Sequence, residues 1–128
     1  KLLLRSQHLP VCCAITHDQN GQLLNTNADT IAASLAKGLT KFFEVSLFYC
    51  FEMPGVLKKI EDKESVIGEI TPKSYTELKN NNVIHSGMIP KIENCFEALK
   101  KGVSEVKIGS PQMISGESKY TKLFLDDY

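Results

Sequence analysis

Residues 87–109 decide the fold class of this chain, and they read GMIPKIENCFEALKKGVSEVKIG. Ser86 and Gly87 predict the opening of a helix, and Gly102 predicts its C-terminal cap. Five apolar side chains recur at the spacing of one helical face: Met88, Ile92, Cys95, Phe96 and Leu99. Residues 103–108 then predict a short strand. A helix that leads directly into a strand is typical of an α/β fold.

The chain on either side of this unit continues the alternation. Residues 44–51 (EVSLFYCF) are almost continuously apolar, which predicts a strand buried on both faces, as in a parallel sheet. Thr71 and Pro72 predict the N-cap and the first residue of another helix, which the asparagines at 80–82 end. Two further short strands are predicted: residues 67–70 and 120–125. We therefore expect a parallel or mixed α/β sheet.

The first forty residues predict a hairpin followed by a helix. Residues 9–16 (LPVCCAIT) predict a strand, residues 17–21 (HDQNG) a tight turn, and residues 22–24 the returning strand. The helix is expected over residues 30–39. Its apolar stripe recurs every fourth residue: Ile31, Leu35 and Leu39.

The composition describes one soluble globular domain spanning residues 1–128. Fifteen basic and fifteen acidic residues give a formal net charge of zero. That balance argues against a generic binder of nucleic acid or of an anionic membrane, which needs a basic excess. No apolar run approaches the ~20 residues of a membrane helix. The first ten residues lack the long apolar core and the cleavage site of a signal peptide.

The cysteines at positions 12, 13, 50 and 95 have no spacing that suits zinc, so no metal-binding residues are predicted. We expect buried reduced thiols in a cytosolic protein rather than a disulfide scaffold.

Three groups of residues could carry chemistry. The segment Asn25 to Asp29 (NTNAD) puts two amides and a carboxylate at a helix N-terminus, which suits a polar or anionic ligand; plain N-capping is the alternative. Lys91 lies in the first turn of a predicted helix, where the helix dipole disfavours a cation; a solvated surface lysine is the alternative. Residues 52–56 (EMPGV) follow a strand, where α/β sheets bind ligands; a simple Pro-Gly turn is the alternative.

Together these segments resemble a known family. Residues 23–39 (LLNTNADTIAASLAKGL), 52–57 (EMPGVL) and 84–109 (IHSGMIPKIENCFEALKKGVSEVKIG) resemble the C-terminal, nucleotide-binding half of the N-acetylglutamate kinases, a branch of the amino-acid kinase family. The resemblance implies a three-layer αβα sandwich of the carbamate kinase-like type. It also implies transfer of the ATP γ-phosphoryl group to the side-chain carboxylate of N-acetyl-L-glutamate, or a related N-acyl-L-glutamate, in arginine biosynthesis. ATP and nucleotide-borne Mg²⁺ are the implied cofactors, and the implied location is cytoplasmic.

The resemblance also implies roles for individual residues. Asn25 corresponds to an asparagine that contacts the amino-acid substrate, and Asn27 belongs to the same motif. Asp29 corresponds to the aspartate that organises the catalytic lysines, and Lys91 to a lysine that stabilises the transferring phosphoryl group. The implied nucleotide-binding residues are Phe51, Glu52, Gly55, Val56, Gly87, Met88 and Lys91. The implied partners are small molecules, with no nucleic acid and no membrane, and a homo-oligomer is left open.

The chain departs from the family in three respects. Phe51 and Glu52 stand where the family has Thr or Ser followed by Asp, and the tail after Gly109 differs from the family's helix-bearing ending. The family's N-terminal half, with its glycine-rich phosphate loop and second catalytic lysine, has no counterpart here. We therefore expect the nucleotide-side half of an enzyme, with little activity alone. The alternatives are a non-catalytic nucleotide-binding or regulatory module with this fold, and a purely structural α/β domain.

Overall fold

The computed structural model describes residues 2–126. The elements follow one another in the order α1 (Leu2–Arg5), β1 (Ile15–His17), β2 (Leu23–Asn25), α2 (Ala28–Leu39), β3 (Ser46–Cys50), β4 (Glu69–Ile70), α3 (Pro72–Asn80), α4 (Ile89–Lys100), β5 (Glu105–Gly109), the 3₁₀ helix η1 (Pro111–Met113) and β6 (Tyr120–Leu123). The three strands predicted at 67–70, 103–108 and 120–125 correspond to β4, β5 and β6. None of the helices within residues 2–126 is long and apolar enough to cross a membrane.

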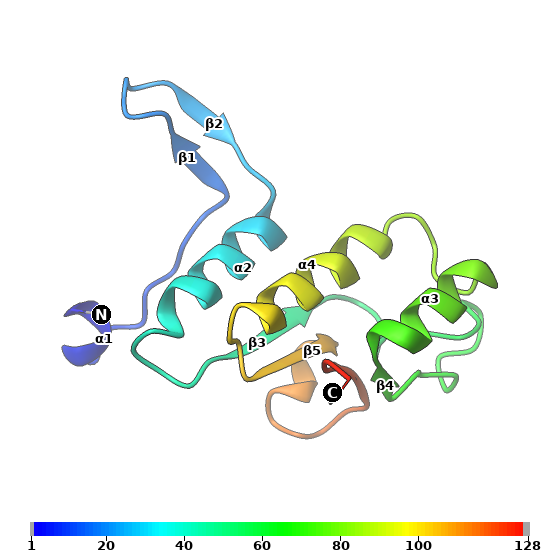
Figure 1. Cartoon of the computed structure of the whole chain (residues 1–128). Coiled ribbons are helices and arrows are strands. Elements are labelled where there is room, and N and C mark those ends of the chain that lie inside the picture. Colours follow the sequence, from blue (N-terminus) through cyan, green and yellow to red (C-terminus); the bar gives the residue numbers. More distant parts are fainter. Residues whose placement is uncertain (1, 127–128) are drawn as a thin grey trace.

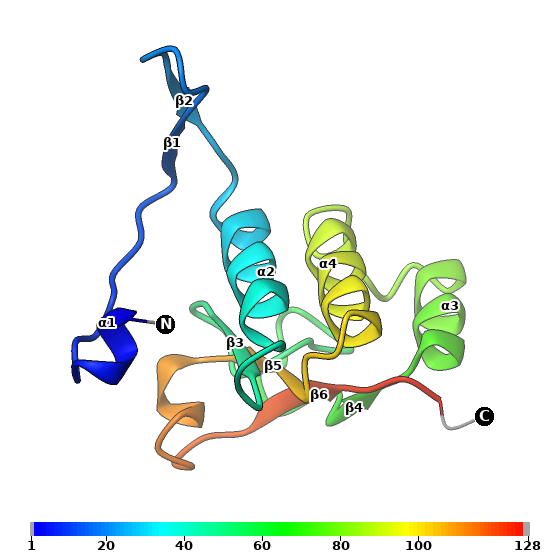
Figure 2. The same ribbon diagram turned by 60° about the vertical axis from the view of Figure 1, so that its left-hand side comes forward.

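The main sheet has four strands in the order β3-β5-β6-β4. Strand β3 pairs in parallel with β5, and β4 pairs in parallel with β6, while β5 and β6 are antiparallel. The sheet is therefore mixed, and the predicted α/β class is confirmed. Its three long helices, α2, α3 and α4, cover one face of the sheet (Figure 1, Figure 2).

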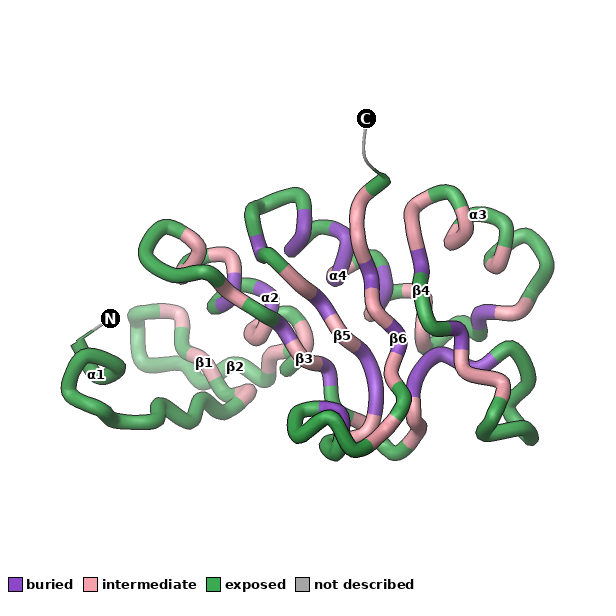
Figure 3. Tube along the Cα trace, turned by 90° about the horizontal axis from the view of Figure 1, so that it is seen from below, coloured by how far each residue is buried: buried purple, intermediate pink, exposed green. Residues whose placement is uncertain are grey.

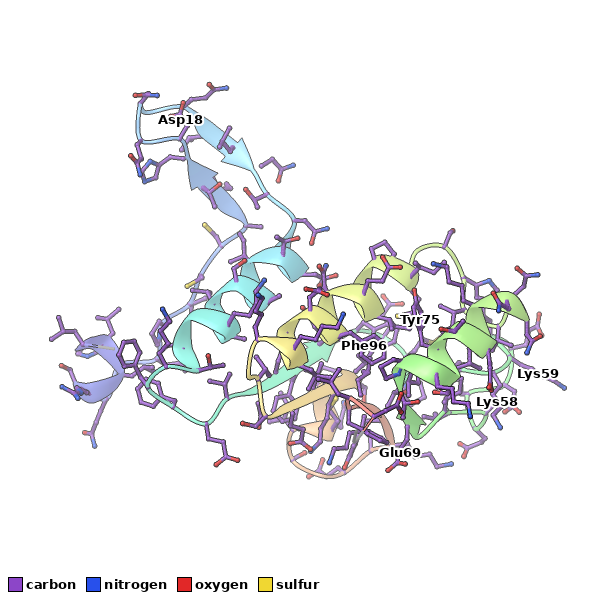
Figure 4. The ribbon with its side chains drawn as sticks, in the orientation of Figure 1. Asp18, Lys58, Lys59, Glu69, Tyr75 and Phe96 are labelled. Carbon is purple, nitrogen blue, oxygen red and sulfur yellow. The ribbon has the colours of Figure 1, made fainter. Side chains whose placement is uncertain are left out.

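The core lies between this helical layer and the sheet, and the tube in Figure 3 shows the buried positions alternating along β5 and β6. Seven of its apolar side chains have no exposed surface: Ile70, Ile92, Cys95, Ala98, Val106, Ile108 and Leu123. Between α3 and α4, the rings of Tyr75 and Phe96 pack with centroids 5.7 Å apart (Figure 4). The described residues thus supply the sheet and one helical layer of the expected sandwich.

The opposite face of the sheet is polar and aromatic. The Lys107 ammonium lies over the rings of Phe48 and Tyr120, 5.4 and 4.7 Å from their centroids, and forms a 3.0 Å ion pair with Glu105. One face of this sheet therefore carries charged side chains, while the other face is apolar and packs against the helices.

Local signals mark the start of α3 and the end of α4. The Thr71 side chain accepts a hydrogen bond from the Ser74 amide, and the Ser74 hydroxyl accepts one from the Thr71 amide, so α3 begins with a capping box as the Thr-Pro signal predicts. Helix α4 begins at Ile89, two residues after Gly87; Ser86 and Gly87, predicted to open it, form a turn, and the N-cap Met88 makes no side-chain capping hydrogen bond. Its predicted apolar stripe faces the core, and Gly102 follows it with a φ of 91°, as a C-terminal glycine should.

The predicted strand over residues 9–16 is wrong for most of its length. Only Ile15–His17 pairs, antiparallel to Leu23–Asn25, and the hairpin projects away from the main sheet (Figure 1). At its tip, the Asp18 carboxylate accepts hydrogen bonds from the amides of residues 20 and 22, which lowers the pKa of that carboxyl. Residues 9–14 have no partner strand among residues 2–126, and Val11 is 90% exposed. A strand needs hydrogen bonds to a neighbouring strand, and the sequence of residues 9–14 alone does not show whether such a neighbour exists.

The buried face of α2 also differs from the prediction. The helix begins at Ala28, two residues early, and its buried side chains are Ala33 and Ala36. In the predicted stripe, Leu35 is exposed, and the other two side chains are half-buried. Helix α2 packs against α4 and β3, and the face it turns to them is the one that carries its small alanine side chains.

Two predictions about burial are wrong. Strand β3 forms as expected, but it is buried on one face only, through Leu47 and Tyr49, because it lies at the sheet edge beneath a single helical layer. The expected buried thiol is found only at Cys95. The other three cysteines are exposed, and all four are free.

Candidate active site

Asp29 and Lys91 meet at the N-termini of two neighbouring helices. Asp29 is the second residue of α2 and Lys91 the third of α4, and both helices begin at the same end of the helical layer (Figure 2). The Lys91 Nζ lies 2.5 Å from the Asp29 Oδ2, with the two side chains 20% and 32% exposed. The helix dipole stabilises the carboxylate in its first turn and repels the ammonium, so Asp29 offsets the unfavourable position of Lys91.

Strand β3 contributes a third member of this site, Tyr49. Its side chain is 4% exposed, and its hydroxyl donates a hydrogen bond to the Asp29 main-chain carbonyl at 3.1 Å. The Lys91 ammonium lies 5.0 Å from the centroid of the Tyr49 ring. Burial, together with the nearby Cys95 and Asp29, raises the pKa of Tyr49, which keeps the phenol neutral and able to donate. The sequence reasoning missed Tyr49, although strand alternation places it on the face of Leu47, and a buried phenol needs an acceptor.

Cys95 lies one helical turn after Lys91 and is fully buried. Burial raises the pKa of its thiol to about 12, against the lowering effect of Lys91. A thiol with that pKa stays protonated at neutral pH, so Cys95 packs in the core and does not act as a nucleophile.

The segment after β3 and the turn before α4 enclose a pocket of about 220 Å³. It contains five of the predicted nucleotide-binding residues: Phe51, Gly55, Val56, Gly87 and Met88. Six further lining residues were not predicted: Met53, Leu57, Ile60, Val83, Ile84 and His85. Ligand pockets usually measure about 300–1,000 Å³, so this one suits an apolar, flat part of a ligand rather than a whole one.

A buried contact with β6 holds the segment that lines this pocket. The Val56 amide donates a 2.7 Å hydrogen bond to the Thr121 hydroxyl, and both residues are buried. A Cβ at Gly55 would lie 2.8 Å from the same hydroxyl oxygen and from a Val66 methyl group, so this close approach requires glycine.

Glu52 and Lys91, also predicted as nucleotide-binding residues, do not line the pocket. Glu52 is exposed and borders a separate surface depression with Lys63 and Lys119. Lys91 lies one helical turn beyond Met88, which does line the pocket. The apolar pocket and the Lys91 ammonium are therefore separate features, and both lie at the start of α4.

The two asparagines of the NTNAD segment differ in what they do. Asn27 is the N-cap of α2, and its side chain accepts hydrogen bonds from the amides of Asp29 and Thr30. Asn25 ends β2, opposite Ile15, and is exposed. Plain N-capping accounts for Asn27, and contact of either asparagine with a substrate stays a prediction. In residues 2–126, no three His, Cys, Asp or Glu side chains cluster as metal ligands.

Comparisons with known proteins identify a family and relatives that this chain resembles. A family model described as "Amino acid kinase family" matches residues 1–110. The acetylglutamate kinase of Cytophaga hutchinsonii is 54% identical over 106 residues, which are 83% of this chain and 40% of that protein. The chain thus spans less than half the length of this relative.

Two solved structures share the fold. The smu.665 protein of Streptococcus mutans superposes with a TM-score of 0.79 at 28% identity, covering 98% of this chain and 46% of that one. Giardia lamblia carbamate kinase bound to AMP-PNP gives 0.60 at 16% identity, covering 88% and 41%. The expected fold type, that of the amino-acid and carbamate kinases, is confirmed.

Proposed function

Because the chain belongs to the amino acid kinase family, we propose that it supplies the nucleotide side of an enzyme that phosphorylates the side-chain carboxylate of N-acetyl-L-glutamate or a related N-acyl-L-glutamate. The phosphoryl donor is ATP, and the product is an acyl phosphate of arginine biosynthesis. The 54% identity to an acetylglutamate kinase supports this choice of acceptor.

The observation that carries this proposal is the continuity between the apolar pocket and Lys91. Gly87 and Met88 line the pocket, and α4 starts immediately after them and presents Lys91 in its first turn. A nucleotide whose base occupies the pocket can extend its phosphates along the start of α4 towards the ammonium. The main-chain N–H groups of a first helical turn have no helical acceptor and add to this attraction.

These groups suit the chemistry of phosphoryl transfer. Negative charge spreads over the oxygens of the transferring phosphoryl group, and a fixed ammonium stabilises it there. A carboxylate oxygen of the acceptor attacks the γ-phosphorus as the bond to the β-phosphate oxygen breaks. The acceptor is already deprotonated at neutral pH, so no general base is needed. Asp29 accordingly orients Lys91 through the 2.5 Å ion pair and need not accept a proton.

The remaining parts of the proposal concern the cofactor, the substrate and the location. Mg²⁺ arrives on the phosphates of ATP, which is how kinases usually hold it, and neutralises part of their charge. Asn25 contacts the amino-acid substrate. The reaction takes place in the cytoplasm, between small molecules. The chain spans 40% of its relative's length, and the second catalytic lysine and the phosphate loop that the family resemblance implies are not among its residues.

Calorimetric titration tests the proposal. We expect MgATP to bind this chain. The Lys91→Ala variant should have an affinity for MgATP about 10- to 100-fold lower, because it loses one charge-assisted hydrogen bond. Adenosine should bind both proteins equally, because the base pocket is unchanged. Lys100→Ala is the matched control, since this lysine lies on the same helix and pairs with Glu97 at the surface. Equal MgATP affinity in the Lys91→Ala variant, or no MgATP binding by the unaltered chain, would contradict this assignment of the site.

A further inference from the structure

Tyr49 lies where the starts of α2 and α4 meet the edge strand of the sheet. Strand β3 points Leu47 and Tyr49 into the helical layer, while Phe48 points to the opposite face. A purely apolar side chain could fill this buried position without bringing in a polar group. A phenol there carries a polar group that must find an acceptor, so its hydroxyl calls for an explanation.

The hydroxyl of Tyr49 attaches α2 to the strand. It donates to the main-chain carbonyl of Asp29, at 3.1 Å. A carbonyl oxygen has two lone pairs, so it can accept this bond besides the one within its helix. The contact holds the first turn of α2, and with it the Asp29 carboxylate, at a defined place over β3.

The ring of Tyr49 acts on the other helix. The Lys91 ammonium lies 5.0 Å from the ring centroid, over a face that carries negative electrostatic potential. The Asp29 carboxylate contacts the same ammonium from α2. Lysine ends in a flexible stem of four carbons, and the positive end of α4 repels its charge. Two attractions from different directions therefore restrict the ammonium more than the ion pair could alone.

We propose that Tyr49 is a positioning residue, which sets where the Lys91 ammonium stands relative to Asp29 by holding one helix through its hydroxyl and the cation through its ring. The ammonium has three N–H donors, and a ring face occupies none of them in a directional bond. Donors thus remain for an anionic ligand while the nitrogen is held in place. The importance of this placement for phosphoryl transfer rests on the proposed function, whereas the placement itself does not.

Nuclear magnetic resonance of the nucleotide-free chain tests the placement. Reductive ¹³C-dimethylation labels every lysine and retains its charge, and the Lys91 signal is identified by its absence in Lys91→Arg. We expect this signal to be shifted upfield by the ring current and to show cross-relaxation with the Tyr49 ring protons. Tyr49→Leu, which fills the space without a ring, should return the signal to the position of the exposed lysines.

A neighbouring residue supplies a matched control. Phe48 lies in the same strand on the opposite face, and its ring lies 5.4 Å from the Lys107 ammonium. Phe48→Leu should move the Lys107 signal and leave the Lys91 signal unchanged. A second variant, Tyr49→Phe, keeps the ring and removes the hydroxyl. It should preserve the Lys91 shift but move the amide nitrogen of Thr30, which shares a peptide unit with the Asp29 carbonyl.

An unshifted Lys91 signal in the unaltered chain would overturn the proposal. So would a Lys91 shift that survives in a folded Tyr49→Leu protein, or an unchanged Thr30 amide in Tyr49→Phe. If Tyr49→Leu does not fold, the cross-relaxation in the unaltered chain and the Tyr49→Phe spectrum decide between the outcomes.

Titration with MgATP separates this proposal from the proposed function. If the unaltered chain binds MgATP, Tyr49→Leu should weaken binding about 2- to 10-fold, in keeping with loss of one cation–π contact. Unchanged affinity with a displaced Lys91 signal would overturn the importance of this placement for the nucleotide. If the unaltered chain does not bind MgATP but shows the expected Lys91 shift, the proposed function fails and the placement by Tyr49 stands.

Discussion

Replacing Thr121 by valine should loosen the segment that lines the apolar pocket. The Thr121 hydroxyl, on β6, accepts a 2.7 Å hydrogen bond from the Val56 amide. Thr121 is fully buried and Val56 is 3% exposed, so water cannot replace the missing acceptor. Valine has nearly the same shape as threonine, so the change removes the hydrogen bond without opening a large cavity.

The expected cost follows from the burial of the donor that remains. A buried amide left without an acceptor costs about 1–3 kcal/mol, which is a large share of the ~5–15 kcal/mol that stabilises a typical domain. Urea denaturation should therefore show a lower midpoint with an unchanged slope. In native-state hydrogen exchange, the Val56 amide should lose its protection, while amides in β5 keep most of theirs.

Thr76→Val is the control for this comparison. Thr76 is an exposed threonine of α3 whose hydroxyl donates to the Pro72 carbonyl, and its replacement should change stability by no more than about 0.5 kcal/mol. If Thr121→Val were as stable as Thr76→Val and the Val56 amide remained protected, the argument that this hydrogen bond holds the pocket segment would be refuted.

Two further predictions concern titratable groups. At pH 8, iodoacetamide should modify the three exposed cysteines of the folded chain and spare Cys95, whose burial raises its pKa to about 12; mass spectrometry should find a fourth modification only in urea, and its appearance in the native chain would contradict this burial. The hydrogen bond from Lys107 lowers the pKa of Glu105 in the folded protein, so the stability it contributes is present above the unfolded pKa of about 4.5 and is lost as the pH falls through the lower, folded value. Glu105→Gln should remove that part of the acid dependence of the urea midpoint, and an identical dependence in both proteins would show that Glu105 does not contribute.

Elements that depend on neighbouring residues could be predicted from the sequence. The Thr71 cap, the Gly102 that follows α4 and the hairpin turn after His17 all formed where expected. Each depends on hydrogen bonds between residues a few positions apart, so the sequence pattern contains all the participants.

For the site, too, residues with local signals could be predicted and residues with distant partners could not. Asp29 and Lys91 could be placed at helix starts from local signals, whereas the family resemblance supplied the five predicted residues that line the pocket. Glu52 lies outside the apolar pocket, because its position in a motif does not say to which side of a loop its side chain turns, and its contact with a nucleotide stays a prediction. Tyr49 was missed, because its partners lie on two helices far away in the sequence.

The sequence by itself determined the order of the three long helices and of the four main-sheet strands, several caps and turns, and the resemblance that points to phosphoryl transfer. Only the tertiary structure decided that α2 buries its alanines, that β3 is covered on one face, and that Asp29 contacts Lys91 across 62 positions of sequence. The physical reason is the range of the interactions. A cap or a turn is completed within a few residues, whereas burial and ion pairing depend on which distant surface packs against each element.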